Sequence, residues 1–387
     1  MLRRSDGCST LHPSAHPSWE NVLLSSGLSI HLLGVPRALR DGRALPSPRG
    51  HKVWGLLAYL LRCDARVGRQ HLAGLLFEDA EDPLGALRWT LSELRRLLGH
   101  ASLRGNELTL TPDTATYIDI DVVVRGAWPE AVGVPDLDRE LLEGMNFAAS
   151  PSFAVWLATE RRHLQAAAEA VLHEGALARL AGGAAAQAAD LAARLVRRNP
   201  LDECSQALLV RCLAAAGDGI GAARQAAACR ELFERGLGMR PGPALDAALR
   251  TATAAPIERP ATGRAAAIAQ MEAGEAAIGA GALDAGLQCL RRGIVEADAT
   301  GDAALRARTR VALGSALVHA ARGCDDEGAT SLHEALVVGQ DAAPSLAAAA
   351  RRELGHVEFL RGRYDRALIW LRQAAALAGD DRAEQAR

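Results

Sequence analysis

The stretch PLGALRWTLSELRRLLG, residues 83–99, predicts an amphipathic helix around which the N-terminal part of the chain is organised. Its leucines recur at steps of three and four, so they form one stripe that packs against a core. The stripe consists of Leu84, Leu87, Leu91, Leu94 and Leu98. The residues predicted to face outward, or to flank the outward face, are Arg88, Trp89, Ser92, Glu93, Arg95 and Arg96.

The outward face of this helix has the chemistry of a DNA reader. Guanidinium groups contact phosphates or guanine, hydroxyls contact either, and an aromatic ring packs on a thymine methyl or a sugar. Arginines on the outer face of an amphipathic helix are also commonly just solvated. Trp89 could likewise pack beneath a neighbouring element instead of facing solvent. The helix alone leaves these alternatives open.

The elements around this helix follow the order of a winged helix, in which the third helix enters the major groove and the following hairpin is the wing. Alternation predicts the strands, with Asp41-Gly42 and Gly105-Asn106 as tight turns, and helical spacing predicts the helices. The predicted elements are strands at 28–34 and 37–45, helices at 49–63, 66–77 and 83–99, a hairpin at 102–111 and a strand at 117–124.

Charge is concentrated in this part of the chain. The whole sequence has a formal net charge of −2, so it has no global field that attracts nucleic acid. Between residues 28 and 104, however, twelve Lys and Arg residues stand against seven Asp and Glu residues, a local excess of +5. Any nucleic-acid contact must therefore come from a local patch.

Four runs within residues 28–124 resemble the DNA-binding domain of the SARP family (Streptomyces antibiotic regulatory proteins). They are GRALPSPRGHKVWGLLAYLL, VGRQHLAGLLF, ALRWTLSELRRLLG and LTLTPDTATYIDIDVV. The resemblance implies that Arg88, Trp89, Ser92, Arg95 and Arg96 face DNA and that Arg104 lies on the wing.

Two residues depart from the family pattern. Glu93 replaces a basic residue and is expected to put a negative charge on the DNA face. Gly68 replaces the Ser or Thr that caps the second helix, at a cost of a few tenths of a kcal/mol.

The next segment resembles the bacterial transcriptional activator domain, which follows the winged helix in SARP proteins. From about Pro135 the chain is predicted to be helical again, and it contains LLEG, SPSFAVWL and ERRHL, followed by NPLDE, AAAGD and LGMRPGPAL. Gly183 and Gly217 are 34 residues apart, which is the tetratricopeptide period. Two modules in the family's order make the resemblance more specific than either module alone.

Alanine-rich units recur in the C-terminal part of the chain. Their turn glycines, Gly281, Gly323 and Gly362, are 42 and 39 residues apart, which predicts a second set of helical hairpins stacked as a solenoid. The last residues, GDDRAEQAR, look like the start of another unit, so we expect a truncated product or the N-terminal part of a longer protein. The predicted fold is therefore mainly α, a winged helix followed by a tetratricopeptide-like activator domain and a helical-hairpin solenoid.

Five segments follow from these patterns. Residues 1–27 lack periodicity and are rich in Ser, His and Pro, which predicts a disordered lead-in. Residues 251–263 also lack periodicity and are rich in small residues and Pro, which predicts a linker. The predicted segments are the lead-in at 1–27, the winged helix at 28–124, the activator domain at 125–250, the linker at 251–263 and the repeats at 264–387.

Motifs for other function classes are missing from the sequence. It contains no phosphate-binding GxxxxGK[ST] loop, no HExxH, no GxSxG and no zinc-finger spacing among its seven cysteines and eleven histidines. No signal peptide or 18-residue apolar run is present. We therefore expect no enzyme, catalytic residue, cofactor, metal site or membrane contact, and a cytoplasmic protein.

The sequence predicts a sequence-specific DNA-binding transcriptional regulator, with activation favoured by the resemblance. The expected partners are promoter DNA with direct repeats, RNA polymerase, a second protomer on DNA, and an unknown protein or small ligand on the C-terminal repeats. The alternative is a protein-interaction scaffold whose winged helix no longer binds DNA, which Glu93 and the near-neutral charge favour.

Overall fold

A computed structural model describes residues 27–63, 65–98, 107–110, 112–113, 115–253, 263–321 and 323–378. The chain divides into two compact units, Met1–Val123 with Gly133–Gln165, and Val124–Val132 with Ala166–Arg387. The predicted lead-in up to residue 26, the turn Gly105-Asn106, most of the predicted linker and the C-terminal tail from residue 379 lie outside the described residues.

The first unit contains a four-stranded sheet in the order β3-β2-β1-β6. The first three strands are β1 (Leu28–His31), β2 (Arg37–Arg40) and β3 (Arg43–Ala44), and they pair antiparallel. Asp41 and Gly42, at φ 50° and 75°, make the tight turn expected between β2 and β3. The fourth strand, β6 (Tyr117–Ile118), returns to lie parallel to β1.

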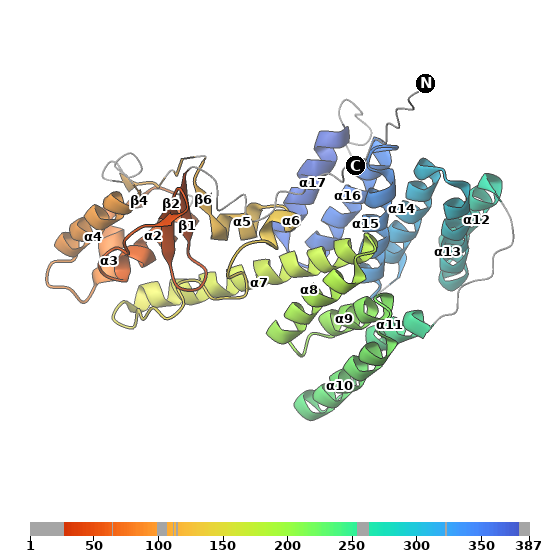
Figure 1. Ribbon diagram of the computed structural model, residues 1–387, viewed down its shortest axis with the longest axis horizontal. Helices are drawn as coiled ribbons and strands as arrows, with labels where there is room; N and C mark the ends of the chain where they lie inside the picture. The colour runs from red at the N-terminus through yellow and green to blue at the C-terminus, as the bar shows by residue number, and fades with distance from the viewer. Residues whose placement is uncertain are drawn as a thin grey trace, which may run out of the picture. The chain divides into compact units, whose positions relative to one another are not determined.

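Three helices pack in this unit in the predicted order: α2 (Lys52–Arg62), α3 (Arg69–Phe77) and α4 (Pro83–Leu98). A short strand, β4 (Val67–Gly68), precedes α3 and pairs antiparallel with β5 (Glu107–Leu108), which follows α4 (Figure 1). This β4–β5 pair holds the base of the predicted wing. Fully buried leucines from all three helices form the core, among them Leu56, Leu57, Leu72, Leu76, Leu87, Leu91 and Leu94.

The predicted strand at 117–124 is wrong beyond its first two residues. After β6 the chain turns into α5 (Asp119–Arg125), with Asp119 in its first turn. Asp119 is fully buried and accepts backbone N–H groups from Leu32 and Leu33, each at 2.8 Å, and from Ile120 at 2.7 Å. Burial raises the pKa of Asp119 to about 6, although these three hydrogen bonds favour its charged form. The carboxylate thus joins the end of β1 to the start of α5.

Residues 133–165 cover α2 and belong to the same unit. The chain forms turns before α7 (Pro151–Ala181) begins, so the helix predicted from about Pro135 starts later. Phe147 and Phe153 pack against Gly55 of α2, where an added Cβ would lie 2.8 Å from the Phe147 ring. Arg62 forms a salt bridge with Glu160, and Ser150 Oγ donates to the carbonyl of Leu76 at 2.7 Å.

The second unit begins at Val124, in the last turn of α5, contains α6 (Trp128–Ala131) and takes in α7 from residue 166 onward. Helices α8 (Ala185–Arg198), α9 (Glu203–Ala215), α10 (Gly219–Leu237) and α11 (Pro243–Thr253) follow. Gly183 and Gly217, which set the predicted repeat, have φ of 77° and 83° in the turns before α8 and α10. Helix α11 runs to Thr253, so the first residues of the predicted linker are helical.

Three antiparallel hairpins follow one another in chain order (Figure 1). They pair α12 (Arg264–Gly279) with α13 (Leu283–Thr300), α14 (Ala303–Ala320) with α15 (Asp325–Gly339), and α16 (Pro344–Leu360) with α17 (Tyr364–Ala378). Gly281, Gly323 and Gly362 all have positive φ in the turns inside these hairpins. The predicted fold class is confirmed: the described chain is mainly helical, with a small N-terminal α+β part followed by helical hairpins.

Buried charges join the activator-like helices to the C-terminal hairpins. Arg366 on α17 is 3% exposed, donates through Nε and Nη2 to Glu174 Oε2 on α7 at 3.0 and 2.7 Å, and also bonds the carbonyl of Gly126. Burial raises the pKa of Glu174 to about 7. Asp326 on α15 meets His173 of α7 at 3.1 Å, Arg211 of α9 at 3.2 Å, and Arg361. These partners hold the pKa of Asp326 far below its usual range, although burial opposes them.

Within the described part of the chain, no helix combines the length and apolar character needed to cross a membrane. All six cysteines that fall in this part are free thiols, with Cys212 and Cys229 buried and Cys204 exposed.

Replacing Asp119 with Asn is expected to destabilise the first unit by about 1–3 kcal/mol, because an amide nitrogen cannot accept the N–H groups that the carboxylate now accepts. Asp41→Asn is the matched control, since Asp41 is exposed in a turn where Asn is well tolerated. Urea unfolding with hydrogen exchange at Leu32 and Leu33 measures the effect. Equal stability of the two variants would contradict the role of Asp119.

Arg366→Met is expected to destabilise the second unit by about 3 kcal/mol or more, because it leaves Glu174 buried without its counter-ion. The double variant with Glu174→Gln should recover part of this loss. Arg235→Met, which breaks an exposed ion pair with Glu231, should cost at most about 1 kcal/mol. Urea unfolding followed by circular dichroism compares the three. If Arg366→Met behaved like Arg235→Met, the buried pair would have no structural role.

Candidate nucleic-acid interface

The outer face of α4 exposes most of the residues predicted to contact DNA. Arg88 and Arg96 each have 69% of the side chain exposed, and Trp89 is 49% exposed. Ser92 is exposed, and Arg95 is partly buried at the border of the face. Arg104 and the predicted wing tip lie outside the described residues. The part of the interface that the structure describes is therefore the outer face of α4 and the residues next to it.

The buried side of α4 is rotated relative to the predicted leucine stripe. Leu87, Leu91 and Leu94 face the core as predicted, but Leu97 joins them in place of Leu98. Leu84, in the first turn, is 43% exposed. Thr90 and Glu93 also lie on the buried side, so helical geometry places Ser92 opposite the core, with Arg88 and Arg96 on either side of it.

Glu93 is the main correction to the predicted face. It was expected to put a negative charge on the DNA side, but its side chain is only 7% exposed. Its carboxylate accepts from Arg96 Nη1 at 2.6 Å and from the backbone N–H of Arg49 at 3.3 Å. The inward-turned carboxylate holds the guanidinium of Arg96 and ties the segment before α2 to α4. As a result, no acidic side chain of α4 lies on its exposed face.

Trp89 packs at the edge of the face instead of beneath it. An added Cβ on Gly50 would lie 3.5 Å from the Trp89 ring, so the ring covers the backbone of Gly50, which has a φ of 83°. About half of Trp89 stays exposed, on the same helix as Arg88 and Ser92. This position leaves the aromatic surface available to a sugar or base.

The ends of α4 are fixed by polar contacts. Asp82 Oδ1 accepts from the backbone N–H of Gly85 at 2.8 Å at the N-terminal end, and Arg88 lies 3.4 Å from the same carboxylate. Both partners of this ion pair are exposed, so it holds Arg88 only weakly. Arg40 of β2 donates to the carbonyl of Leu97 at 3.3 Å at the C-terminal end.

Arg49 is a candidate that the sequence patterns did not single out. It is exposed, and its backbone is tied to Glu93, which places the residue beside the outer face of α4. The only signal in the sequence was its membership of the local basic excess. Elsewhere in the described residues no group of three His, Cys, Asp or Glu side chains could hold a metal ion.

Residues 125–251 match the family model of the bacterial transcriptional activator domain. This match supports the SARP-like character of the chain and its assignment to transcriptional regulation. The matched residues belong to both compact units: 133–165 lie in the first, and 125–132 and 166–251 lie in the second.

One solved structure with similarity is Mycobacterium tuberculosis EmbR in complex with a low-affinity phosphopeptide. The sequences are 21% identical, the match covers 58% of this chain and 64% of that chain, and the TM-score is 0.42. The match therefore spans less than two thirds of that structure. No curated protein matches the chain.

Glu93→Arg is expected to destabilise the protein by about 3 kcal/mol or more, because it puts an unpaired cation into a buried site beside Arg96. Ser92→Arg adds the same side chain to the exposed face and should change stability by no more than about 0.5 kcal/mol. Thermal unfolding followed by circular dichroism distinguishes the two. If the Glu93→Arg protein were as stable as the Ser92→Arg protein, the side chain of Glu93 would have to lie on the exposed face instead of the buried side.

Proposed function

We propose that the chain is a DNA-binding transcriptional regulator whose winged helix, residues 28–124, reads a major groove with the outer face of α4. Ser92 lies at the centre of that face, where it can reach a base edge or phosphate. Arg88, Arg95 and Arg96 supply guanidinium groups around it, and Trp89 supplies an aromatic surface. Arg104 would contact the backbone beside the minor groove from the wing.

One observation carries the proposal: an exposed basic and aromatic helix face stands directly before a segment that matches a transcriptional activator domain. The order of elements from β1 to β5 supports it, since α4 occupies the place of the third helix and β4–β5 the base of the wing. The local excess of positive charge supports it as well, because phosphate contacts provide most of the affinity for DNA.

The remaining roles follow from the resemblance. Two protomers would bind promoter DNA that contains direct repeats. Residues 125–250 would form the contacts between protomers, and this segment together with the winged helix would contact RNA polymerase. The C-terminal repeats, residues 264–387, would bind a further protein or small ligand. In this assignment the chain acts in the cytoplasm and carries out no catalysis.

The scaffold alternative loses its most specific support. It was favoured by a negative charge on the DNA face, and Glu93 is instead buried and paired with Arg96. The near-neutral net charge of the whole chain still favours the scaffold.

The test uses the full chain and the duplex that it selects from a random-sequence pool. The double variant Arg95→Ala/Arg96→Ala is expected to lose about 1–3 kcal/mol of binding free energy per arginine that contacts a base. Each lost phosphate contact should also make the salt dependence shallower by about 0.9 in log K against log salt. Fluorescence anisotropy at several salt concentrations measures both.

Arg43→Ala is the matched control, because Arg43 is exposed on β3 and lies off the proposed face. It should bind like the parent protein, and all variants should keep the parent's circular dichroism spectrum. Binding of the double variant with parental affinity would exclude this face, and failure of the full chain to enrich any duplex would favour the scaffold.

A further inference from the structure

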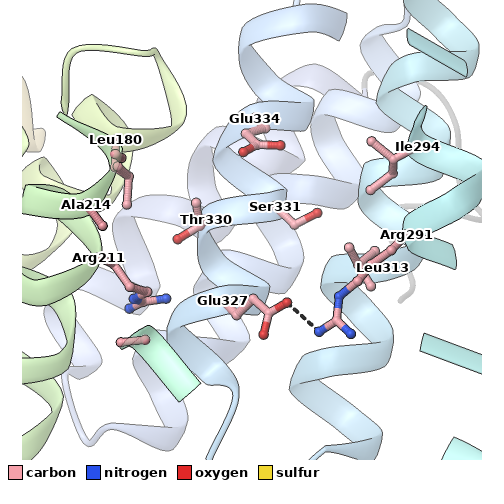
Figure 2. Close-up of a pocket in the computed structure, with 12 residues that line it drawn as sticks. Leu180, Arg211, Ala214, Arg291, Ile294, Leu313, Glu327, Thr330, Ser331 and Glu334 are labelled. Carbon is pink, nitrogen blue, oxygen red and sulfur yellow. Dashed lines mark hydrogen bonds and ion pairs between the residues drawn. The ribbon is translucent and has the colours of Figure 1, made fainter. Parts of the chain in front are cut away.

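A pocket of about 460 Å³ lies in the second unit, within the size range of small-molecule sites. Its walls come from helices far apart in the sequence: the end of α7, α9 and α11 on one side, and α13, α14 and α15 on the other (Figure 2). Ala248 belongs to one hydrophobic core with Ala214 packed against it, and Leu313 belongs to another with Ile294 packed against it. The pocket therefore opens between two cores and is lined largely by apolar atoms.

Arg211 is the polar group in this pocket with the most unused hydrogen-bonding capacity. Among the described residues, its only bond runs from Nη2 to Asp326 Oδ2 at 3.2 Å, and its Nε has no partner. Asp326 is also shared with His173 and Arg361. An arginine has five N–H donors, so Arg211 can bind an anion without giving up its present contact.

The other charged groups of the lining are already paired. Arg291 Nη2 donates to Glu327 Oε1 at 2.6 Å, which Figure 2 shows as a dashed line. Glu334 accepts from Arg310 Nε at 3.1 Å. Both carboxylates disfavour a ligand with several negative charges, whereas Arg211 disfavours a cation. The chemistry that remains is one negative charge on an apolar body.

We propose that this pocket binds an amphipathic monocarboxylate. The carboxylate would pair with the free edge of the Arg211 guanidinium, as planar carboxylates do with arginine. The apolar body would lie along Leu180, Ala214, Ala248, Ile294 and Leu313. The hydroxyls of Thr330 and Ser331 donate to the backbone carbonyls of Asp326 and Arg310, so each keeps a lone pair that can accept from a water or ligand group.

Such a ligand would act as a bridge inside the second unit. It would fill the space between the core of the activator-like helices and the core of the C-terminal hairpins, and so favour the arrangement in which these helices are packed together. This inference does not depend on DNA binding, because the ligand is measured on the protein alone.

The experiment titrates the full chain with octanoate by isothermal calorimetry at neutral pH, with octanol and octylamine as chain-matched controls. Octanoate should bind at least about tenfold more tightly than octanol, since a hydrogen bond to a charged partner contributes about 1.5–3 kcal/mol. Octylamine should bind more weakly still. Octanoate should also slow hydrogen exchange in α9 and α15.

Two variants locate the site. Arg211→Met should remove the preference for octanoate over octanol, whereas Arg211→Lys should retain part of it, because the charge remains but the planar fork is lost. Ala214→Leu should abolish binding of both ligands by filling the pocket while Arg211 stays in place. Circular dichroism shows whether each variant is folded. If Arg211→Met does not fold, the binding of octanoate to Arg211→Lys and Ala214→Leu tests the site. The proposal fails if octanoate does not bind, if octanol binds equally well, or if folded Arg211→Met and Ala214→Leu proteins bind octanoate like the parent.

Discussion

The second unit depends on carboxylates that are buried against guanidinium groups. Glu174 accepts from Arg366 of α17 and Asp326 accepts from Arg211 of α9, pairs that are 192 and 115 residues apart in sequence. A buried charge is stable only when it is paired, so these contacts constrain how α7 and α9 meet α15 and α17. The helices from residue 166 onward in the segment that matches the activator domain lie in one compact unit with the C-terminal hairpins.

The same principle operates on a smaller scale in the first unit. Asp119 and Glu93 are both acidic residues placed inside, and each is held by backbone N–H groups from another element. Asp119 joins α5 to the end of β1, while Glu93 joins the segment before α2 to α4. The proposed DNA face is positive because the one acidic side chain on the exposed half of the predicted helix wheel is turned inward and occupied.

Much of the fold could be predicted because its signals are local. Leucine periodicity located α2, α3 and α4, the Asp41-Gly42 pair located the β2–β3 turn, and spaced glycines located the turns of the helical hairpins. The failures involved residues whose partners are distant in sequence. DVVV was expected to be extended because valine favours strands, yet Asp119 begins a helix there by accepting N–H groups from Leu32 and Leu33.

The candidate site shows the same limit. Arg88, Trp89, Ser92 and Arg96 are exposed as their spacing indicated. Glu93 was expected on the same outward face, because the predicted leucine stripe did not include the rotation of the buried side or the contacts with Arg96 and the Arg49 backbone. Arg49 and Arg211 have no local pattern at all. Their positions follow from Glu93 in one case and from Asp326 in the other, and both contacts exist only in the folded chain.

The packing of residues 133–165 bears on where the protein can be cut. Phe147 and Phe153 fill the space over Gly55, and Trp156 stacks edge-on against Tyr59 of α2. A fragment that ended at residue 124 would keep α4 but expose this aromatic surface to water. A fragment that keeps the surface covered has to include the first turns of α7, because the proposed DNA-binding helix and the early part of the segment that matches the activator domain lie in one compact unit.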